Sequence, residues 1–233
     1  MEALLAGAGM AAPPPLTDLL EPDLISQVPA DLADLLALLP QADVYLQDEV
    51  QFAFHPTLTR VWCRKGRRGQ RLVVAPGQNA KVYGFGIVDW VDGWFDGQLA
   101  AGRTAAAFCA QVRTAVARSQ ARGRVAIVLA DNLRTHTASG SKLVRQMLEE
   151  LRDQLKIVYT PAYDPDANRI EWLWRISRRA VTHNHQRDTW QEVQDDIRDH
   201  FALLAQRPNE VLHHIGSAFA EERTITSALA LAA

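Results

Sequence analysis

The chain has 233 residues, 48% of them hydrophobic and 22% charged, which is enough to bury a sizeable core in one domain. Its formal net charge of −2 does not by itself indicate a nucleic-acid partner. No apolar run reaches the roughly 18 residues that a membrane span needs, and the first residues lack the basic segment of a signal peptide. We therefore expect a cytoplasmic protein without membrane contacts.

The first 40 residues differ in composition from the rest, being rich in alanine, leucine and proline. The run Pro13-Pro14-Pro15 interrupts any regular element, and only residues 31–39 predict a short helix. We interpret residues 1–40 as a short N-terminal arm, too short for a complete helix-turn-helix domain.

The next part of the chain has the pattern of β-structure. Aromatic, β-branched and glycine residues predict three strands, over residues 44–54, over residues 80–90, and between Gly93 and Gly97. A Lys-Gly-Arg-Arg-Gly turn between the first two strands predicts a hairpin, with arms at residues 59–64 and 70–74.

Helical spacing appears in the second half of the chain. It predicts four helices: one after Thr104, one from Leu143 to Leu151, one from Ile170 to Val181, and one starting at Asp188, with Gln191 in a capping-box position, and running through Phe201. Short apolar runs predict two further strands, over residues 125–130 and 156–160. This order predicts an α/β fold with a mixed sheet of about five strands flanked by helices. We assign residues 41–210 to this domain and 211–233 to a C-terminal helical tail.

Three carboxylates occupy positions where a metal site can form. Asp48 lies within an apolar strand, Asp131 directly follows another, and Glu171 lies in the first turn of a helix. Singly, each has an ordinary explanation: an edge-strand residue facing solvent, a turn or cap, or a partner for Arg175 at i+4. Together they match the carboxylate set of a two-metal site, whose hard Mg²⁺ ions prefer such oxygens.

The residues around these acids form three recognisable segments. They read Leu46-Gln-Asp-Glu49, Leu129-Ala-Asp-Asn-Leu-Arg-Thr-His136, and a segment from Tyr159 to Trp174 with the frame Pro-x-Tyr-x-Pro-x-x-Asn-x-Ile-Glu-x-x-Trp. The three segments resemble the signatures of bacterial IS630-type transposases of the Tc1/mariner superfamily, over roughly residues 40–205. The resemblance implies an RNase H-like three-layer fold and a metal-binding triad of Asp48, Asp131 and Glu171.

The same resemblance implies a function and its cofactor. Such enzymes cleave DNA phosphodiester bonds and transfer strands, acting on element ends and target DNA with two Mg²⁺ ions, for which Mn²⁺ can substitute. Supporting roles near the metals fall to Asn132, His136 and Asn168. We expect a homodimer, or pairing with a partner that carries the N-terminal DNA-binding region, and association with the nucleoid when DNA is bound.

Two basic clusters suit phosphate contacts, although each alone could be a solvated surface. The candidate DNA-binding residues are Arg64, Lys65, Arg67, Arg68, Arg175 and Arg178.

The chain also departs from the family pattern. Arg169 stands where a proline is usual, and the segment between Asp131 and Glu171 is a few residues longer than usual. A helix extended around Glu149–Leu155 would absorb the difference. Two alternatives stay open: an RNase H-like nuclease without strand transfer, and a non-catalytic DNA-binding or regulatory remnant of a transposase.

Overall fold

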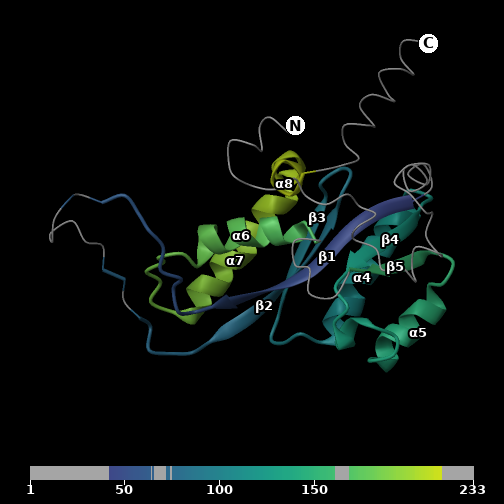
Figure 1. Cartoon of the computed structure of the whole chain (residues 1–233), viewed down its shortest axis with the longest axis horizontal. Helices are drawn as coiled ribbons and strands as arrows, with labels where there is room; N and C mark the ends of the chain where they lie inside the picture. The colour runs from purple at the N-terminus through teal and green to yellow at the C-terminus, as the bar shows by residue number, and fades with distance from the viewer. Residues whose placement is uncertain (1–41, 64, 66–71, 74, 161–167, 217–233) are drawn as a thin grey trace, which may run out of the picture.

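A computed structural model describes residues 42–63, 65, 72–73, 75–160 and 168–216. Its centre is a five-stranded sheet with the strand order β3-β2-β1-β4-β5 (Figure 1). The strands are β1 (Ala42–Ala53), β2 (Lys81–Asp89), β3 (Phe95–Ala100), β4 (Val125–Ala130) and β5 (Leu155–Tyr159). The pairs β1–β2 and β2–β3 are antiparallel. β4 and β5 run parallel to β1. The predicted mixed sheet of about five strands is confirmed.

Helices pack on both faces of this sheet. They are α4 (Ala105–Ala121), the short 3₁₀ helix η4 (Arg134–His136), α5 (Lys142–Glu150), α6 (Ile170–Val181), α7 (Trp190–Ala205) and α8 (Pro208–Ile215). In Figure 1, α6, α7 and α8 gather on one side of the molecule and α4 and α5 on the other. No helix in the described ranges is long and apolar enough to cross a membrane.

Alternation along β1 divides the interior into two cores. Val44, Leu46 and Val50 pack with α6, α7 and α8, on what we call the α6 face of the sheet. Tyr45 belongs to a separate core with α4 and α5, on the α4 face. Because successive side chains of a strand point to opposite faces, Asp48 continues the α6-face series, and Glu49 points to the α4 face.

Two helix boundaries differ from the predicted ones. The last long helix is capped by Thr189, which forms a reciprocal capping box with Glu192, one residue beyond the predicted pair Asp188 and Gln191. The predicted helical extension around Glu149–Leu155 is wrong, because α5 ends at Glu150. The amides of Gln154 and Leu155 then donate to the carbonyl of Leu151, which forms a turn into β5.

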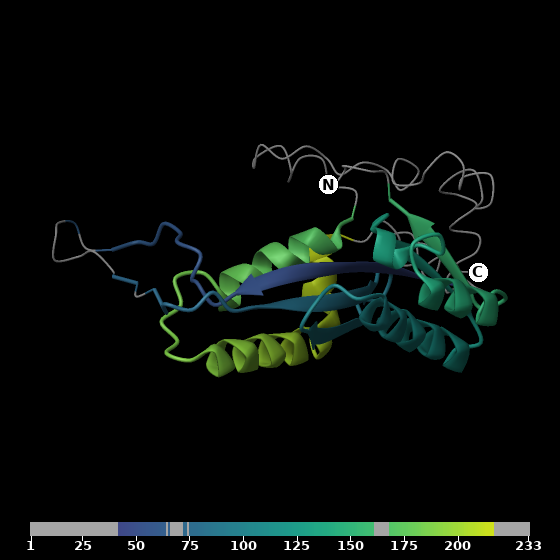
Figure 2. The ribbon, with the colours of Figure 1, turned by 90° about the horizontal axis from the view of Figure 1, so that it is seen from below.

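The predicted hairpin at residues 59–64 and 70–74 is also wrong in the part that the structure describes. None of the described members of its arms, 59–63 and 72–73, lies in a strand. The hydrogen bonds of this segment go instead to the chain after α6. Thr57 forms a parallel bridge with His183, and Asn184 binds the backbone of Thr59 with both its carbonyl oxygen and its amide. In Figures 1 and 2 the described parts of this segment extend away from the sheet.

The proposed domain boundaries meet the described residues only in part. The arm at residues 1–40 lies outside the described ranges. The boundary between residues 210 and 211 falls within α8, where Val211 and Ile215 are buried in the α6-face core.

Candidate active site

Asp48 and Asp131 lie on neighbouring parallel strands at the same level of the sheet. Leu46 of β1 is in register with Leu129 of β4, and each aspartate comes two residues later. The side chains of Leu46 and Leu129 both lie in the α6-face core, so the period of two directs both aspartates toward that face. Asp131 stands at the carboxyl end of β4, the edge at which ligands of open α/β sheets bind.

Glu171 reaches the same region from α6, which Asn168 fastens to β1. The buried Asn168 amide donates to the Gln47 carbonyl, 2.8 Å away, and its carbonyl oxygen accepts from the amide of Ile170. One side chain therefore ties the start of α6 to the residue before Asp48. The supporting role of Asn168 near a metal site stays a prediction.

Trp174, one turn further along α6, contacts Asp48 directly. Its indole Nε1 donates to Asp48 Oδ2 at 3.0 Å, and its ring is fully buried. Gly86, the partner of Asp48 on β2, makes room for that ring. A Cβ atom at Gly86 would lie 2.1 Å from Trp174 Cη2, so a side chain at this position is incompatible with the tryptophan.

The charges of these acids act on one another. Burial, followed by the negative charge of Glu171, raises the pKa of Asp48 well above its usual value, and Glu49 and Asp131 act in the same direction. Glu171 and Asp131 thus both lie within electrostatic range of Asp48. A divalent cation would relieve their mutual repulsion.

His136 forms a hydrogen bond with Asp131 and so helps to fix the position of its carboxylate. Its Nδ1 lies 2.5 Å from Asp131 Oδ1, and its ring is stacked on Phe108 with centroids 4.3 Å apart. Burial alone would lower the pKa of His136, but hydrogen bonding to Asp131 and Glu49 raises it to about 9. Burial would raise the pKa of Asp131, but the hydrogen bond from His136 lowers it below its usual value. Asp131 is therefore held as a carboxylate.

The donor set fits a hard divalent metal, since Asp48, Asp131 and Glu171 offer carboxylate oxygens, which such ions prefer, and Asp131 and Glu171 both act electrostatically on Asp48. Their arrangement is not that of a loaded site. Within the described ranges, no three His, Cys, Asp or Glu side chains are grouped closely enough to hold a metal ion. Asp48 Oδ2 faces Trp174 and Asp131 Oδ1 faces His136, so metal binding would require these carboxylates to turn or share their oxygens.

The remaining predicted residues are spread more widely. Asn132 is exposed beside Asp131, and Lys65 is exposed on the segment between β1 and β2. On α6, Arg175 is exposed and lies over the Trp172 ring, and Arg178 is half-buried one turn further. Arg64, Arg67 and Arg68 lie outside the described residues.

Sequence reasoning missed Glu49. This acid is 6% exposed, and its Oε1 lies 2.8 Å from His136 Nε2. The alternation of β1 was a usable signal, because an acid directly after Asp48 in an apolar strand must point into the opposite core. Its partner could not be read from the sequence, because His136 lies 87 positions later.

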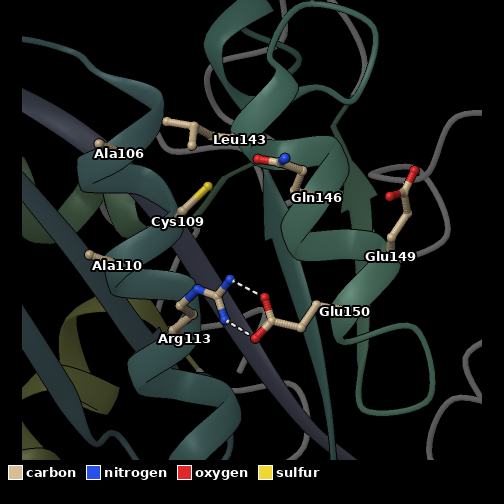
Figure 3. A pocket seen from close by; sticks show the side chains of 8 residues that line it. All are labelled: Ala106, Cys109, Ala110, Arg113, Leu143, Gln146, Glu149 and Glu150. Carbon is tan, nitrogen blue, oxygen red and sulfur yellow. Dashed lines mark hydrogen bonds and ion pairs between the residues drawn. The ribbon is translucent and has the colours of Figure 1, made fainter.

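Hollows in the described part of the chain lie elsewhere, and two of them are the larger ones. One, of about 840 Å³, lies between α4 and α5, where Figure 3 shows the Cys109 thiol and the paired Arg113 and Glu150. The second, of about 430 Å³, is formed by the segment after β1 and the end of α6. Its lining residues are Thr59, Arg60, Val61, Arg179, His183 and Asn184. Neither hollow contains any of the three carboxylates.

Comparison with known proteins agrees with this geometry. Residues 43–194 match the family model described as DDE superfamily endonuclease. The chain is 27% identical over 165 residues to the "Insertion element IS630 uncharacterized 39 kDa protein" of Shigella sonnei, a match covering 71% of this chain and 46% of that protein. The chain thus spans about half the length of this curated relative.

Solved structures of the Mos1 transposase share the fold. In a paired-end complex with the left transposon end, the identity is 18% and the TM-score 0.52, over 94% of this chain and 70% of that one. A Mos1 mariner paired-end complex with Mg gives 17% identity and a TM-score of 0.51, over 91% and 65% of the respective chains. The expected RNase H-like fold is confirmed. Because the family model covers well over half of the 233 residues, the chain belongs to the DDE superfamily endonucleases.

Proposed function

We propose that this chain is the catalytic core of a transposase that cleaves DNA phosphodiester bonds and transfers strands. The observation that carries the proposal is that Glu171 of α6 and Asp131 at the end of β4 both lie within electrostatic range of Asp48 on β1. Burying the Asp48 carboxylate beside the charge of Glu171 is costly, and a bound cation would offset that cost. The IS630 relative and the Mos1 structures support the same assignment.

In this proposal the three carboxylates hold two Mg²⁺ ions, which Mn²⁺ can replace. When bound, such ions activate water or a 3′-hydroxyl and stabilise the leaving oxygen. The protein supplies the positions of the ligands. Trp174 orients Asp48, His136 orients Asp131, and Asn168 fixes the start of the helix that carries Glu171.

DNA would lie along α6. Arg175, Arg178 and Arg179 follow Glu171 at i+4, i+7 and i+8, and so form a basic row on one side of the helix. Arg179 is about 12 Å from Glu171 along the helix axis, which corresponds to roughly four phosphates of one strand.

The row ends at the 430 Å³ hollow, where Arg60 comes from the segment after β1. Burial lowers the pKa of His183 at this hollow, and the positive charges of Arg179 and Arg178 lower it further. In the described part of the chain, neither Arg60 nor Arg179 forms an ion pair, so both are available for phosphates. The DNA would comprise element ends and target, bound by a homodimer or together with a partner carrying a DNA-binding domain.

Nicking of supercoiled plasmid in Mn²⁺ or Mg²⁺ tests the proposal. Asp131→Asn should abolish nicking with little change in the fold, because it removes a metal-binding charge and preserves volume. Asp48→Asn and Glu171→Gln should behave alike, and their losses should not add, because the three side chains act as one unit.

The matched control is Arg113→Met, which removes an exposed ion pair on α4 and should leave nicking unchanged. Undiminished metal-dependent nicking by Asp131→Asn would contradict the triad. Joining a cut element end to a second DNA then separates a transposase from a nuclease without strand transfer, and DNA binding without any nicking would indicate a non-catalytic remnant.

A further inference from the structure

His136 connects two acids that belong to opposite faces of the sheet. Its Nδ1 lies 2.5 Å from Asp131, on the edge where the metals would bind. Its Nε2 lies 2.8 Å from Oε1 of Glu49, an ion-pair distance, although the direction falls outside hydrogen-bond geometry. The imidazole is 1% exposed, so its contact with the buried Glu49 is shielded from water, whereas the Asp131 side chain is 44% exposed.

The ring has little freedom to turn. Phe108 of α4 is stacked on it with an angle of 16° between the planes. The Tyr159 hydroxyl donates to the His136 carbonyl at 2.9 Å and so fixes the backbone of η4 to the end of β5. The ring is therefore held between Glu49 and Asp131.

Glu49 is itself held in place. The Gln47 amide lies 3.4 Å from Glu49 Oε1 and 3.3 Å from the Gln111 side-chain oxygen on α4. A buried carboxylate is costly without compensation, so its retention behind the site calls for a partner that benefits from the charge.

We infer that Glu49 is a positioning residue for the metal-binding carboxylate Asp131, acting through His136. The inference rests on the proposed function, since it assigns Asp131 to the metal site. Glu49 holds the imidazole from the Nε2 side, so that His136 presents the N–H of Nδ1 to Asp131, which sets the direction of the carboxylate oxygens. Outer partners of this kind commonly change metal affinity or activity 10- to 100-fold when they are removed.

A double-mutant cycle on the full chain tests the inference, with the Mn²⁺ concentration for half-maximal nicking as the readout. Glu49→Gln keeps the volume and removes the charge, and should raise that concentration at least about tenfold. His136→Asn keeps an amide donor near the Nδ1 position but removes the link to Glu49. In the His136→Asn background, Glu49→Gln should change the Mn²⁺ requirement less than about twofold, because the coupling is lost.

A purely structural role for Glu49 predicts a different pattern. Ser177→Ala is the matched control, because it removes a buried hydroxyl that binds the Leu173 carbonyl and His200, away from Asp131. It should lower the melting temperature without changing the Mn²⁺ requirement. If Glu49→Gln behaves like Ser177→Ala, or has the same effect in both backgrounds, the inference is wrong.

The rise in melting temperature with Mn²⁺ gives a second readout for variants whose nicking is too slow to measure. Glu49→Gln should shift this rise to higher Mn²⁺ concentration in the wild-type background only. Failure of the inference is distinguishable from failure of the proposed function. If Asp131→Asn abolishes nicking and Glu49→Gln does not alter metal dependence, only the role of Glu49 is refuted. If Asp131→Asn still nicks DNA, or the wild-type chain responds to Mn²⁺ in neither assay, both are refuted.

Discussion

Two groups of carboxylates lie along β1 with opposite charge balance. At the start of the strand, Asp43 belongs to a network with Asp89 and Asp92 that arginines of α4 and the following turn neutralise. The ion pairs of this network are Arg118 with Asp89 and Asp92, Arg122 with the same two and Asp43, and Arg124 with Asp43. Five residues further along β1, Asp48 has Glu171, Glu49 and Asp131 as its charged neighbours.

The difference distinguishes carboxylates whose ion pairs stabilise the fold from carboxylates that are available to bind a cation. In the first group, which we call the arginine network, Asp43 and Asp89 are 2% and 1% exposed and lie next to guanidinium groups. In the second group, which we call the acidic site, burial of Asp48 is balanced only by the indole N–H of Trp174 and by backbone. A fold that can pair buried acids with arginine at one position and does not do so nearby leaves the second position for a cation.

Breaking the arginine network should have the largest effect on stability. Arg118→Met removes both bonds to Asp89 and Asp92 and the stacking over Trp94, and it leaves Asp89 buried with only the more distant Arg122. We expect a loss of about 3 kcal/mol in the free energy of unfolding, measured by urea denaturation.

Arg113→Met is the control for that measurement, since Arg113 and Glu150 are more than 40% exposed, so that solvent screens their pair and its loss should cost far less than the loss of Arg118. Equal losses in the two variants would mean that the arginine network does not support the fold.

Filling the acidic site should have the next largest effect, in the opposite direction. Mg²⁺ or Mn²⁺ should stabilise the folded chain by about 2.7 kcal/mol at a hundredfold excess over the dissociation constant, for one site. The melting temperature in a thermal scan should rise accordingly, and Asp131→Asn should suppress the rise. A melting temperature that does not respond to either metal would contradict a metal site at these three acids.

The smallest effects on the free energy of unfolding, but effects of opposite sign, should come from an Asp→Asn substitution in each group. Because the pKa of Asp48 is raised in the folded state, its ionised form disfavours folding at neutral pH, and the cost fades as the pH falls toward the unfolded pKa. Asp48→Asn should therefore stabilise the metal-free chain at pH 7, by on the order of 1 kcal/mol.

Burial would raise the pKa of Asp92, but the amide of Trp94 and the charge of Arg118 lower it. Asp92 thus contributes stability above its unfolded pKa of 3.8 that is lost as the pH falls through its folded value. Asp92→Asn should destabilise the chain at pH 7 and have little effect in acid. Urea denaturation at pH 7, and again at a pH below the folded pKa of Asp92, checks both signs. Destabilisation by both substitutions at pH 7 would remove the distinction between the two groups.

The sequence by itself determined the five strands of the sheet and most of the helices, and it singled out the three candidate acids. These depend on short-range patterns: apolar runs ending at Asp131, a strand period of two around Asp48, and a helix start at Glu171. Such patterns fix which face of an element is buried, whatever its neighbours are, so they can be read without the fold.

Only the tertiary structure decided which residues meet across the sheet. The link from Glu49 through His136 to Asp131 depends on β4 lying parallel beside β1, on Phe108 of α4 stacking on the ring, and on the register between the two strands. The segment after β1 likewise forms hydrogen bonds with Asn184 and does not pair with itself as the predicted hairpin would. Partners separated by about a hundred positions are chosen by strand order and register, which arise from the packing of the whole core and leave no local pattern in the chain.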